Sequence, residues 1–145
     1  MIQIREIKAE DTYSIRKKEL RKNMTLSEKV PGDFDENTIH LGVFDQDELA
    51  CVATFMKTKS PAFRGEQYQL RGMATEESHQ RKGLGRAVLL EAEDILINRD
   101  VDILWCNARV SALDFYKKIG YKTVGEVFEI PQIGPHYVMY KKLSK

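Results

Sequence analysis

The sequence predicts an α/β protein: one domain over residues 1–145 with a mixed, mostly antiparallel sheet of about seven strands and helices on both faces. Three observations lead to this fold class. Short apolar runs with strand-like spacing are separated by Gly, Pro and Asp. The run that ends at Thr75 is followed by a helical stretch and then by an apolar run at 101–106, an order that predicts two parallel strands with a right-handed crossover. A length of 145 residues suits one core.

Composition is that of an ordinary globular protein. Hydrophobic residues make up 42% of the chain, charged residues 31%, and the formal net charge is +1. So small a charge gives no reason to expect a nucleic acid or an acidic membrane as partner. Cys51 and Cys106 lie in apolar runs, which predicts buried, reduced thiols in a cytoplasmic protein and no disulfide or metal site. We recognise no signal peptide and no membrane-spanning run.

The first third of the chain predicts a strand, a helix and a loop. Alternating isoleucines indicate a strand within residues 2–7. Asp11 can cap a helix that runs to about Arg21, with Ile15 and Leu20 directed toward the core. The basic residues of this helix are expected on a solvated face, namely Arg16, Lys17, Lys18, Arg21 and Lys22. The segment 23–37 loses the apolar period and predicts a loop.

A hairpin follows, with strands at 40–45 and 49–57 and a turn at 46–48. Both faces of the second strand are apolar, which places it in the interior of the sheet. His40 is interpreted as a strand residue and not as a metal ligand, because no second metal-binding residue lies at a useful spacing. In the next strand, which ends at Thr75, Gly72 predicts a β-bulge.

The second half predicts a long helix that ends near Asn98, a strand at 101–106 and a short helix at 111–118. Two last strands are expected at 121–129 and 136–142. The apolar stripe of the long helix consists of Leu84, Val88, Ala92, Ile95 and Leu96.

The turn before the long helix has the composition of an anion site. Gly83 and Gly85 stand beside the cations Arg81, Lys82 and Arg86. Unpaired N–H groups at a helix start, the helix dipole and nearby cations all favour a phosphate. Glycines also let a ligand approach the backbone closely. The spacing fits neither a Walker loop nor a dinucleotide fingerprint, and a tight turn with a solvated basic rim is the alternative interpretation.

The segment Gln80–Gly85 resembles the Arg/Gln-x-x-Gly-x-Gly/Ala signature of the GNAT superfamily of N-acetyltransferases, and the C-terminal part of the chain is similar to its ElaA-like branch. The similarity is marked from Tyr68 to the end of the chain and fair from Ile39. It includes Asn107 and the segments 112–121, 126–131 and 133–139. The resemblance implies the GNAT fold, in which the parallel strand pair at the centre of the sheet is splayed.

The resemblance also implies acetyl-coenzyme A as co-substrate. The strand that ends at Thr75 would pair with the pantetheine arm, and the glycine turn would hold the pyrophosphate. The implied cofactor-binding residues are Met73, Ala74, Thr75, Gln80, Arg81, Lys82, Gly83, Leu84, Gly85, Arg86, Asn107 and Tyr116. For Asn107, a cap on the turn after the strand is an equally good interpretation.

The implied reaction is direct attack of a primary amine on the thioester. Tyr116 matches the family's tyrosine and is the expected general acid, since a phenol with a pKa of about 10 can protonate the departing thiolate; simple packing is the alternative. His136, Glu76 and Glu66 are candidates for the general base, and His136 is attractive because imidazole titrates at about pH 6.5. A covalent route through Cys106 is disfavoured, because no histidine pairs with it by position.

The sequence thus predicts an acetyl-CoA-dependent N-acetyltransferase. A GNAT-like module that only senses acyl-CoA is the alternative, and a nucleotide-phosphate protein ranks below both because no carboxylate is placed to hold magnesium. The acceptor could be a small amine, an amino acid, a polyamine, an antibiotic or a peptide amine. The segments 23–37 and 129–136 are expected to wall its pocket, although 23–37 could equally be a plain connector. A homodimer would be common for the superfamily.

Overall fold

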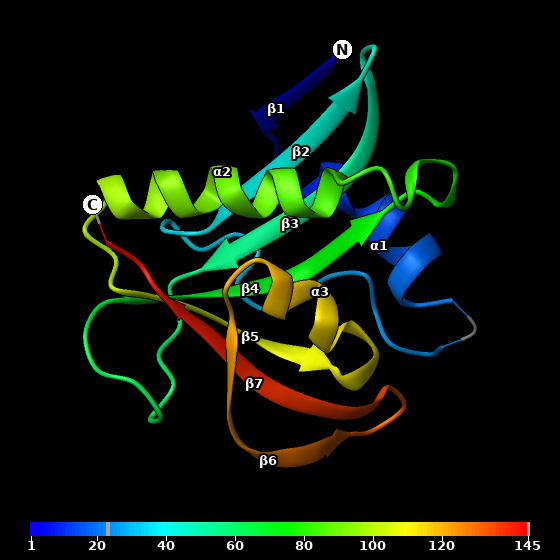
Figure 1. Cartoon of the computed structure of the whole chain (residues 1–145). Helices are drawn as coiled ribbons and strands as arrows, with labels where there is room; N and C mark the ends of the chain where they lie inside the picture. The colour runs from blue at the N-terminus through cyan, green and yellow to red at the C-terminus, as the bar shows by residue number, and fades with distance from the viewer. Residues whose placement is uncertain (23, 145) are drawn as a thin grey trace.

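The computed structural model describes residues 1–22 and 24–144 (Figure 1). Within them, seven strands form one sheet in the order β1-β2-β3-β4-β5-β7-β6. The strands are β1 (Ile2–Glu6), β2 (Ile39–Asp45), β3 (Glu48–Met56), β4 (Gln67–Thr75), β5 (Ile103–Arg109), β6 (Lys122–Ile130) and β7 (Gly134–Lys142). The α-helices are α1 (Tyr13–Leu20), α2 (Leu84–Asn98) and α3 (Leu113–Lys118), and the short 3-10 helices are η1 (Ala9–Thr12), η2 (Glu77–His79) and η3 (Val110–Ala112).

The parallel pair of the sheet is β4 and β5, and it is open over most of its length. Their ladder contains three residue pairs, from Gln67↔Ile103 to Gln69↔Trp105. Beyond Gln69 the two strands separate, so the edge of β4 that faces β5 has no strand partner there. The other neighbouring strands pair antiparallel. The predicted mixed, mostly antiparallel sheet with a splayed parallel pair is therefore confirmed.

Strand β3 is covered on both faces, as its apolar pattern predicted. Its side chains Ala53 and Phe55 belong to the main core, together with Val88 of α2. On the opposite face, Val52 packs against Ile15 of α1. The long helix α2 lies across β2, β3 and β4 in Figure 1 and closes the larger core. Helices on both faces thus fix the sheet, because each covers an apolar surface that would otherwise meet water.

A β-bulge in β4 lies at the predicted position, next to the point where β4 and β5 part. Val52 pairs with Ala74 and Thr54 pairs with Arg71, so β4 has one residue more than β3 over this interval. Gly72, inside the interval, has a φ of +60°, a left-handed value that glycine adopts without steric penalty. The extra residue bends β4 and so helps to hold the central gap open.

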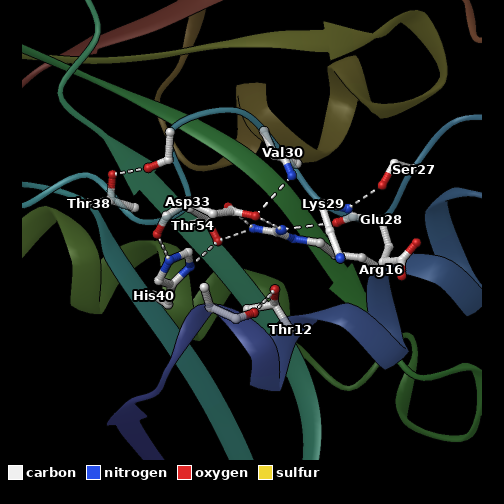
Figure 2. A network of polar contacts seen from close by, with 12 residues as sticks. Thr12, Arg16, Ser27, Glu28, Lys29, Val30, Asp33, Thr38, His40 and Thr54 are labelled. Carbon is white, nitrogen blue, oxygen red and sulfur yellow. Dashed lines mark hydrogen bonds and ion pairs between the residues drawn. The ribbon is translucent and has the colours of Figure 1, made fainter.

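The prediction that Arg16 lies on a solvated helix face is wrong. Its side chain is 1% exposed and lies under the described part of the loop, residues 24–37 (Figure 2). The guanidinium donates to both carboxylate oxygens of Asp33, at 2.8 and 2.9 Å, and to the Thr54 hydroxyl at 2.7 Å. A buried cation requires a buried anion. Asp33 provides it, and the pair fastens the loop to α1 and β3.

His40 completes this buried network and is a structural strand residue of β2, as interpreted from the sequence. Its Nε2 lies 2.8 Å from the carbonyl oxygen of Asp33, and its Nδ1 lies 2.8 Å from the Thr54 hydroxyl. Because a carbonyl only accepts, Nε2 carries the proton. In the neutral ring Nδ1 then accepts from Thr54, whose oxygen accepts from Arg16. The donor and acceptor assignments along this series of hydrogen bonds are therefore mutually consistent.

Candidate functional site

Two cavities meet where β4 and β5 separate. One, of about 590 Å³, lies at the start of α2 and is called the turn cavity. The other, of about 320 Å³, lies between the diverging strands and is called the inter-strand cavity. Leu20, Met73 and Phe115 line both. The two spaces are therefore parts of one groove that crosses the central gap of the sheet.

The turn cavity ends at the N-terminus of α2, which offers free backbone donors. Gly83 is the N-cap residue, and among the described side chains none caps the helix. The amide of Ala87 donates to the Gly83 carbonyl at 3.0 Å, so the preceding N–H groups of the helix, from Leu84 to Arg86, have no acceptor within the helix. The first turn contains no acidic residue. Helix dipole and free donors together make this end attractive to an anion.

The two glycines of the turn have different physical roles. Gly83 has a φ of +79°, in the left-handed region, and a Cβ there would meet no atom within 4 Å. Its backbone is thus open to a ligand, and the conformation favours glycine. At Gly85 a Cβ would lie 3.3 Å from Cζ of Phe115. The absence of a side chain at Gly85 therefore lets α3 pack close to the start of α2.

Polar contacts tie the turn to the end of β4 and to α1. The side-chain amide of Gln80 donates to the Thr75 carbonyl at 3.1 Å. The Glu19 carboxylate accepts from the Glu77 backbone amide at 3.0 Å. These contacts fix the approach of the chain to α2, so Gln80 holds the shape of the turn in addition to lining the cavity.

Tyr116 projects from α3 into the inter-strand cavity and is 8% exposed. Its ring packs edge-on against Phe115 and Tyr121. Burial raises the pKa of Tyr116 well above its ordinary value, contact with Cys106 adds to this, and the positive charge of Arg109 opposes it. The phenol is therefore protonated at neutral pH. Burial also raises the pKa of the Cys106 thiol to about 12, so this cysteine stays a thiol.

His136 lines the same cavity from β7 and is 3% exposed. Its Nδ1 lies 2.7 Å from the Gly134 carbonyl, which can only accept, so Nδ1 carries the proton. In the neutral ring Nε2 is then an acceptor, and it has no hydrogen-bond partner among residues 1–22 and 24–144. The ring lies against Phe128, with ring centroids 6.0 Å apart. This arrangement fixes the tautomer and leaves one basic nitrogen free.

The two carboxylates proposed as bases lie elsewhere. Glu76 forms an ion pair with Lys18 at 2.7 Å, and Glu66 stands beside the amino-terminal end of β4, 3.7 Å from Lys57. Neither lines the turn cavity or the inter-strand cavity. Local sequence could not separate these candidates, because it does not tell which side chains point into a cavity that several elements form together.

The remaining predicted residues divide between the cavities. Asn107 joins Tyr116 in the inter-strand cavity, while Lys82 lines neither. The turn cavity is lined by Met73, Ala74, Thr75, Gln80, Arg81, Gly83, Leu84, Gly85 and Arg86. The segment 129–136 lines the inter-strand cavity through Ile130, Ile133 and His136; that this cavity holds the acceptor stays a prediction. The described part of the loop 23–37 provides no lining residue; the end of α1 stands there, through Leu20 and Arg21.

Sequence reasoning missed a cluster of arginines around the inter-strand cavity. Arg21, Arg71 and Arg109 all line it. The sequence predicts Arg21 on a solvated helix face and assigns no role to Arg71. The available signal was the Arg71–Gly72 dipeptide, since a bulge redirects the neighbouring side chains. The three residues lie far apart in the sequence, and only the fold brings them together.

Two further properties concern the described residues as a whole. They contain no group of three or more His, Cys, Asp or Glu side chains arranged to hold a metal ion. Nor is any helix among them long and apolar enough to cross a membrane.

The central strand pair is thus splayed, with a glycine turn at a helix start on one side of the gap and a buried tyrosine on the other. The chain belongs to the GNAT family of acetyltransferases, since the family model "Acetyltransferase (GNAT) domain" matches residues 6–143. The predicted family is thus confirmed. The Bacillus subtilis (strain 168) protein described as "Uncharacterized N-acetyltransferase YitI" is 39% identical over 145 residues, which cover 99% of this chain and 97% of that protein.

Solved structures of acetyltransferases have the same fold as this chain. Escherichia coli ElaA has a TM-score of 0.79 at 18% identity, covering 97% of this chain and 99% of that chain. An aminoglycoside 6'-N-acetyltransferase complexed with coenzyme A has a TM-score of 0.76 at 16% identity, covering 97% of this chain and 96% of that chain. At such identities these likenesses concern the fold.

Proposed function

We propose that the protein transfers an acetyl group from acetyl-coenzyme A to a primary amine by direct attack of the amine on the thioester. The observation that carries this proposal is the continuous groove through the central gap of the sheet. One end offers unpartnered helix N–H groups, and the other contains Tyr116 and His136. Membership of the GNAT family and the coenzyme A bound by a structural neighbour support the same choice of co-substrate.

The residues of the turn cavity fit the pyrophosphate and pantetheine of coenzyme A. Gly83 is open to close approach, the amides from Leu84 to Arg86 are free within the helix, and Arg81 lines the cavity. The edge of β4 from Met73 to Thr75 has no pairing to β5, which leaves its backbone groups to bind an extended arm. Main-chain donors at a fixed place can also polarise a thioester carbonyl.

We assign Tyr116 as the general acid. Its phenol remains protonated at neutral pH because burial raises its pKa, so a proton is present when the coenzyme A thiolate departs. The nearby charge of Arg109 lowers that pKa and thereby favours the phenolate left behind. The proton is then replaced from solvent. In this role the residue acts on the breakdown of the tetrahedral intermediate and has little part in cofactor affinity.

We assign His136 as the general base. The attacking amine must lose a proton, and Nε2 is the free acceptor nitrogen of a ring whose tautomer the Gly134 carbonyl fixes. Among the three sequence candidates it is the one that lines the inter-strand cavity. Direct attack is further supported by Cys106, whose pKa of about 12 leaves almost no nucleophilic thiolate at neutral pH.

The test begins with calorimetric titration of the full chain with acetyl-coenzyme A, using ATP and magnesium as control. We expect micromolar binding of acetyl-coenzyme A alone, on the order of −8 kcal/mol. Release of free coenzyme A is then followed with a panel of amines. Preference for ATP would contradict the cofactor assignment. Tight binding with no turnover on any amine would favour the acyl-CoA sensor instead.

A further inference from the structure

The arginines of the inter-strand cavity come from three separate elements. Arg21 follows α1, Arg71 precedes the bulge of β4, and Arg109 ends β5. All three line the cavity of about 320 Å³, and no Asp or Glu is among its described lining residues. In the β5–β7 ladder Arg109 lies opposite His136. The positive charge therefore stands beside the proposed base and acid.

Among the described residues, no carboxylate forms an ion pair with any of these three arginines. Arg71 and Arg109 have no hydrogen-bond or ion-pair partner within the described part of the chain. Arg21 donates only to backbone carbonyls, those of Ser27 at 3.1 Å and Leu20 at 3.4 Å. Asp33 acts on Arg71 through its charge, but both of its oxygens are already bound by Arg16. Arg71 and Arg109 are thus cations without a partner among the described residues, and Arg71 is exposed to solvent.

The guanidinium group of Arg21 is close enough to those of Arg71 and Arg109 to be disfavoured by their charges. Burial, followed by the charges of Arg109 and Arg71, lowers the pKa of Arg21. Burial, followed by the charge of Arg16, lowers the pKa of Arg71. Guanidinium nevertheless stays protonated in proteins. Like charges gathered beside a cavity repel, and an anion bound there would remove the repulsion and supply the missing acceptors.

The cluster is separate from the proposed pyrophosphate site. Arg81 and Arg86 line the turn cavity, and neither of them lines the inter-strand cavity. Conversely, Arg21, Arg71 and Arg109 do not line the turn cavity. An anion held by these three residues would therefore lie on the acceptor side of the thioester.

We propose that the acceptor is a small amine that carries a carboxylate or phosphate group, which Arg21, Arg71 and Arg109 bind in the inter-strand cavity. This inference rests on the proposed acetyl transfer. Guanidinium forks match the oxygen pairs of carboxylate and phosphate. A space of about 320 Å³ is at the lower end of ligand pockets and must also admit the acetyl group, so the acceptor is small. Its anion would point at the arginines and its amine at His136.

Matched amines test this directly. β-Alanine is compared with β-alaninamide, and O-phosphoethanolamine with ethanolamine, because each pair differs in the negative charge. Rates are corrected for the fraction of free amine. In at least one pair, we expect kcat/KM to be at least about tenfold higher for the anionic member, a difference of about 1.4 kcal/mol. The pair that shows the larger ratio distinguishes carboxylate from phosphate.

Variants then locate the effect. In Arg71→Gln, kcat/KM for the anionic amine should fall at least about tenfold, mainly through KM, while the neutral partner changes less than about twofold. Arg71→Lys should restore part of the loss, since it returns the charge without the fork. Arg99→Gln, an exposed residue at the end of α2, is the control and should behave like the unaltered protein. Acetyl-coenzyme A affinity should be equal in all of them.

A binding measurement separates failure of this inference from failure of the transfer proposal. The anionic amine is titrated calorimetrically into the protein saturated with coenzyme A. Binding that Arg71→Gln abolishes would support the anion site even where no amine turns over. Equal rates for the members of each pair, or equal losses for both members in Arg71→Gln, would overturn the inference and leave acetyl transfer intact. If no amine is acetylated and no anionic amine binds, both the anion site and the acetyl transfer proposal are overturned.

Discussion

Tyr116 and Arg16 are both buried, but burial has opposite consequences for them. Burial disfavours the charged phenolate of Tyr116 and so raises the pKa of this residue. The neutral phenol, which is the form able to donate a proton, is thereby favoured. Arg16 remains a cation with a side-chain exposure of 2%, and its stability depends on Asp33, whose side chain is equally buried. Loss of the Tyr116 hydroxyl leaves no buried charge without a partner, whereas loss of the Arg16 guanidinium does.

Replacement of Tyr116 by Phe should lower kcat at least about tenfold, or about 1.4 kcal/mol of barrier. The affinity for acetyl-coenzyme A should hardly change, because in the proposed role the hydroxyl acts only on the leaving thiolate. Single-turnover kinetics and calorimetry measure the two quantities. Tyr140→Phe is a matched control, since Tyr140 packs against Phe63 outside both cavities of the groove. Unchanged turnover in Tyr116→Phe would remove this residue from the acid role.

Replacement of Arg16 by Met should lower the free energy of unfolding by about 3–5 kcal/mol, because it leaves the Asp33 carboxylate buried without a partner. The double variant Arg16→Met/Asp33→Leu should be more stable than Arg16→Met, since neither charge of this buried pair remains. Arg5→Met removes an exposed ion pair with Asp47 and should change stability by less than about 1 kcal/mol. Urea denaturation measures all three. A double variant no more stable than the single one would show that the buried charge is not the cause.

At the scale of elements, the start of α2 and the gap beside β4 both present unpaired backbone groups to the groove. The helix presents free amides because Gly83 adopts a left-handed conformation and no described side chain caps it. The strand presents a free edge because its pairing with β5 stops after Gln69. Both features are made of main chain. Side chains such as Gln80 only keep them in place.

Gly83→Glu should raise the Kd for acetyl-coenzyme A at least about a hundredfold, because bulk and negative charge enter the anion site. Gly125→Glu is the control: its φ of +76° nearly equals the +79° of Gly83, and a Cβ at either place meets no atom within 4 Å. Each substitution should therefore cost the same backbone strain, about 1–2 kcal/mol. Calorimetry measures the Kd for acetyl-coenzyme A, and thermal unfolding measures the stability of the two variants. Tight binding by Gly83→Glu would refute the turn assignment.

At the scale of the whole molecule, the protein consists of two half-sheets, β1 to β4 and β5 to β7. They share the three residue pairs between β4 and β5 and the core under α2. The buried network around Arg16 lies within the first half and fixes the loop 23–37 to it. Global stability should accordingly respond to the ionisation of that network.

Acid should destabilise the protein partly through Asp33. Burial alone would raise the pKa of Asp33, but hydrogen bonds from Arg16 and from the Val30 amide together lower it below its ordinary value. A depressed pKa contributes stability above the unfolded-state pKa of about 3.9, and this contribution is lost as pH falls through the folded-state pKa. The stability difference between the unaltered protein and Asp33→Asn should therefore shrink below about pH 4. Urea midpoints measured from about pH 6 to pH 3 check this; a constant difference would contradict it.

Local signals predicted most of the fold. Alternating apolar residues located the strands, and Gly72 located the bulge. The glycines before α2 located the turn, whereas the splay of β4 and β5 came from family resemblance and has no periodic signature. Tertiary pairing escaped prediction for a physical reason: Arg16 is buried because a loop residue neutralises it, and no short-range pattern contains that information. The same holds for Arg21, Arg71 and Arg109, which only the folded sheet assembles.

The donors and acceptors along the central gap belong to the main chain, and this affects how related proteins can diverge in sequence. A donor that belongs to the backbone survives almost any substitution that preserves the fold, so point changes cannot easily delete it. The inter-strand cavity is lined by residues of β4, β5 and α3, by the end of α1 and by the region around the β6–β7 turn. Apart from the proposed acid and base, Tyr116 and His136, each of these residues can change by a single codon. Descendants of such a domain can therefore exchange one acceptor for another while the chemistry of the acetyl donor stays the same. Sequence drift should accumulate on the acceptor walls, where an inhibitor selective for one member would have to bind.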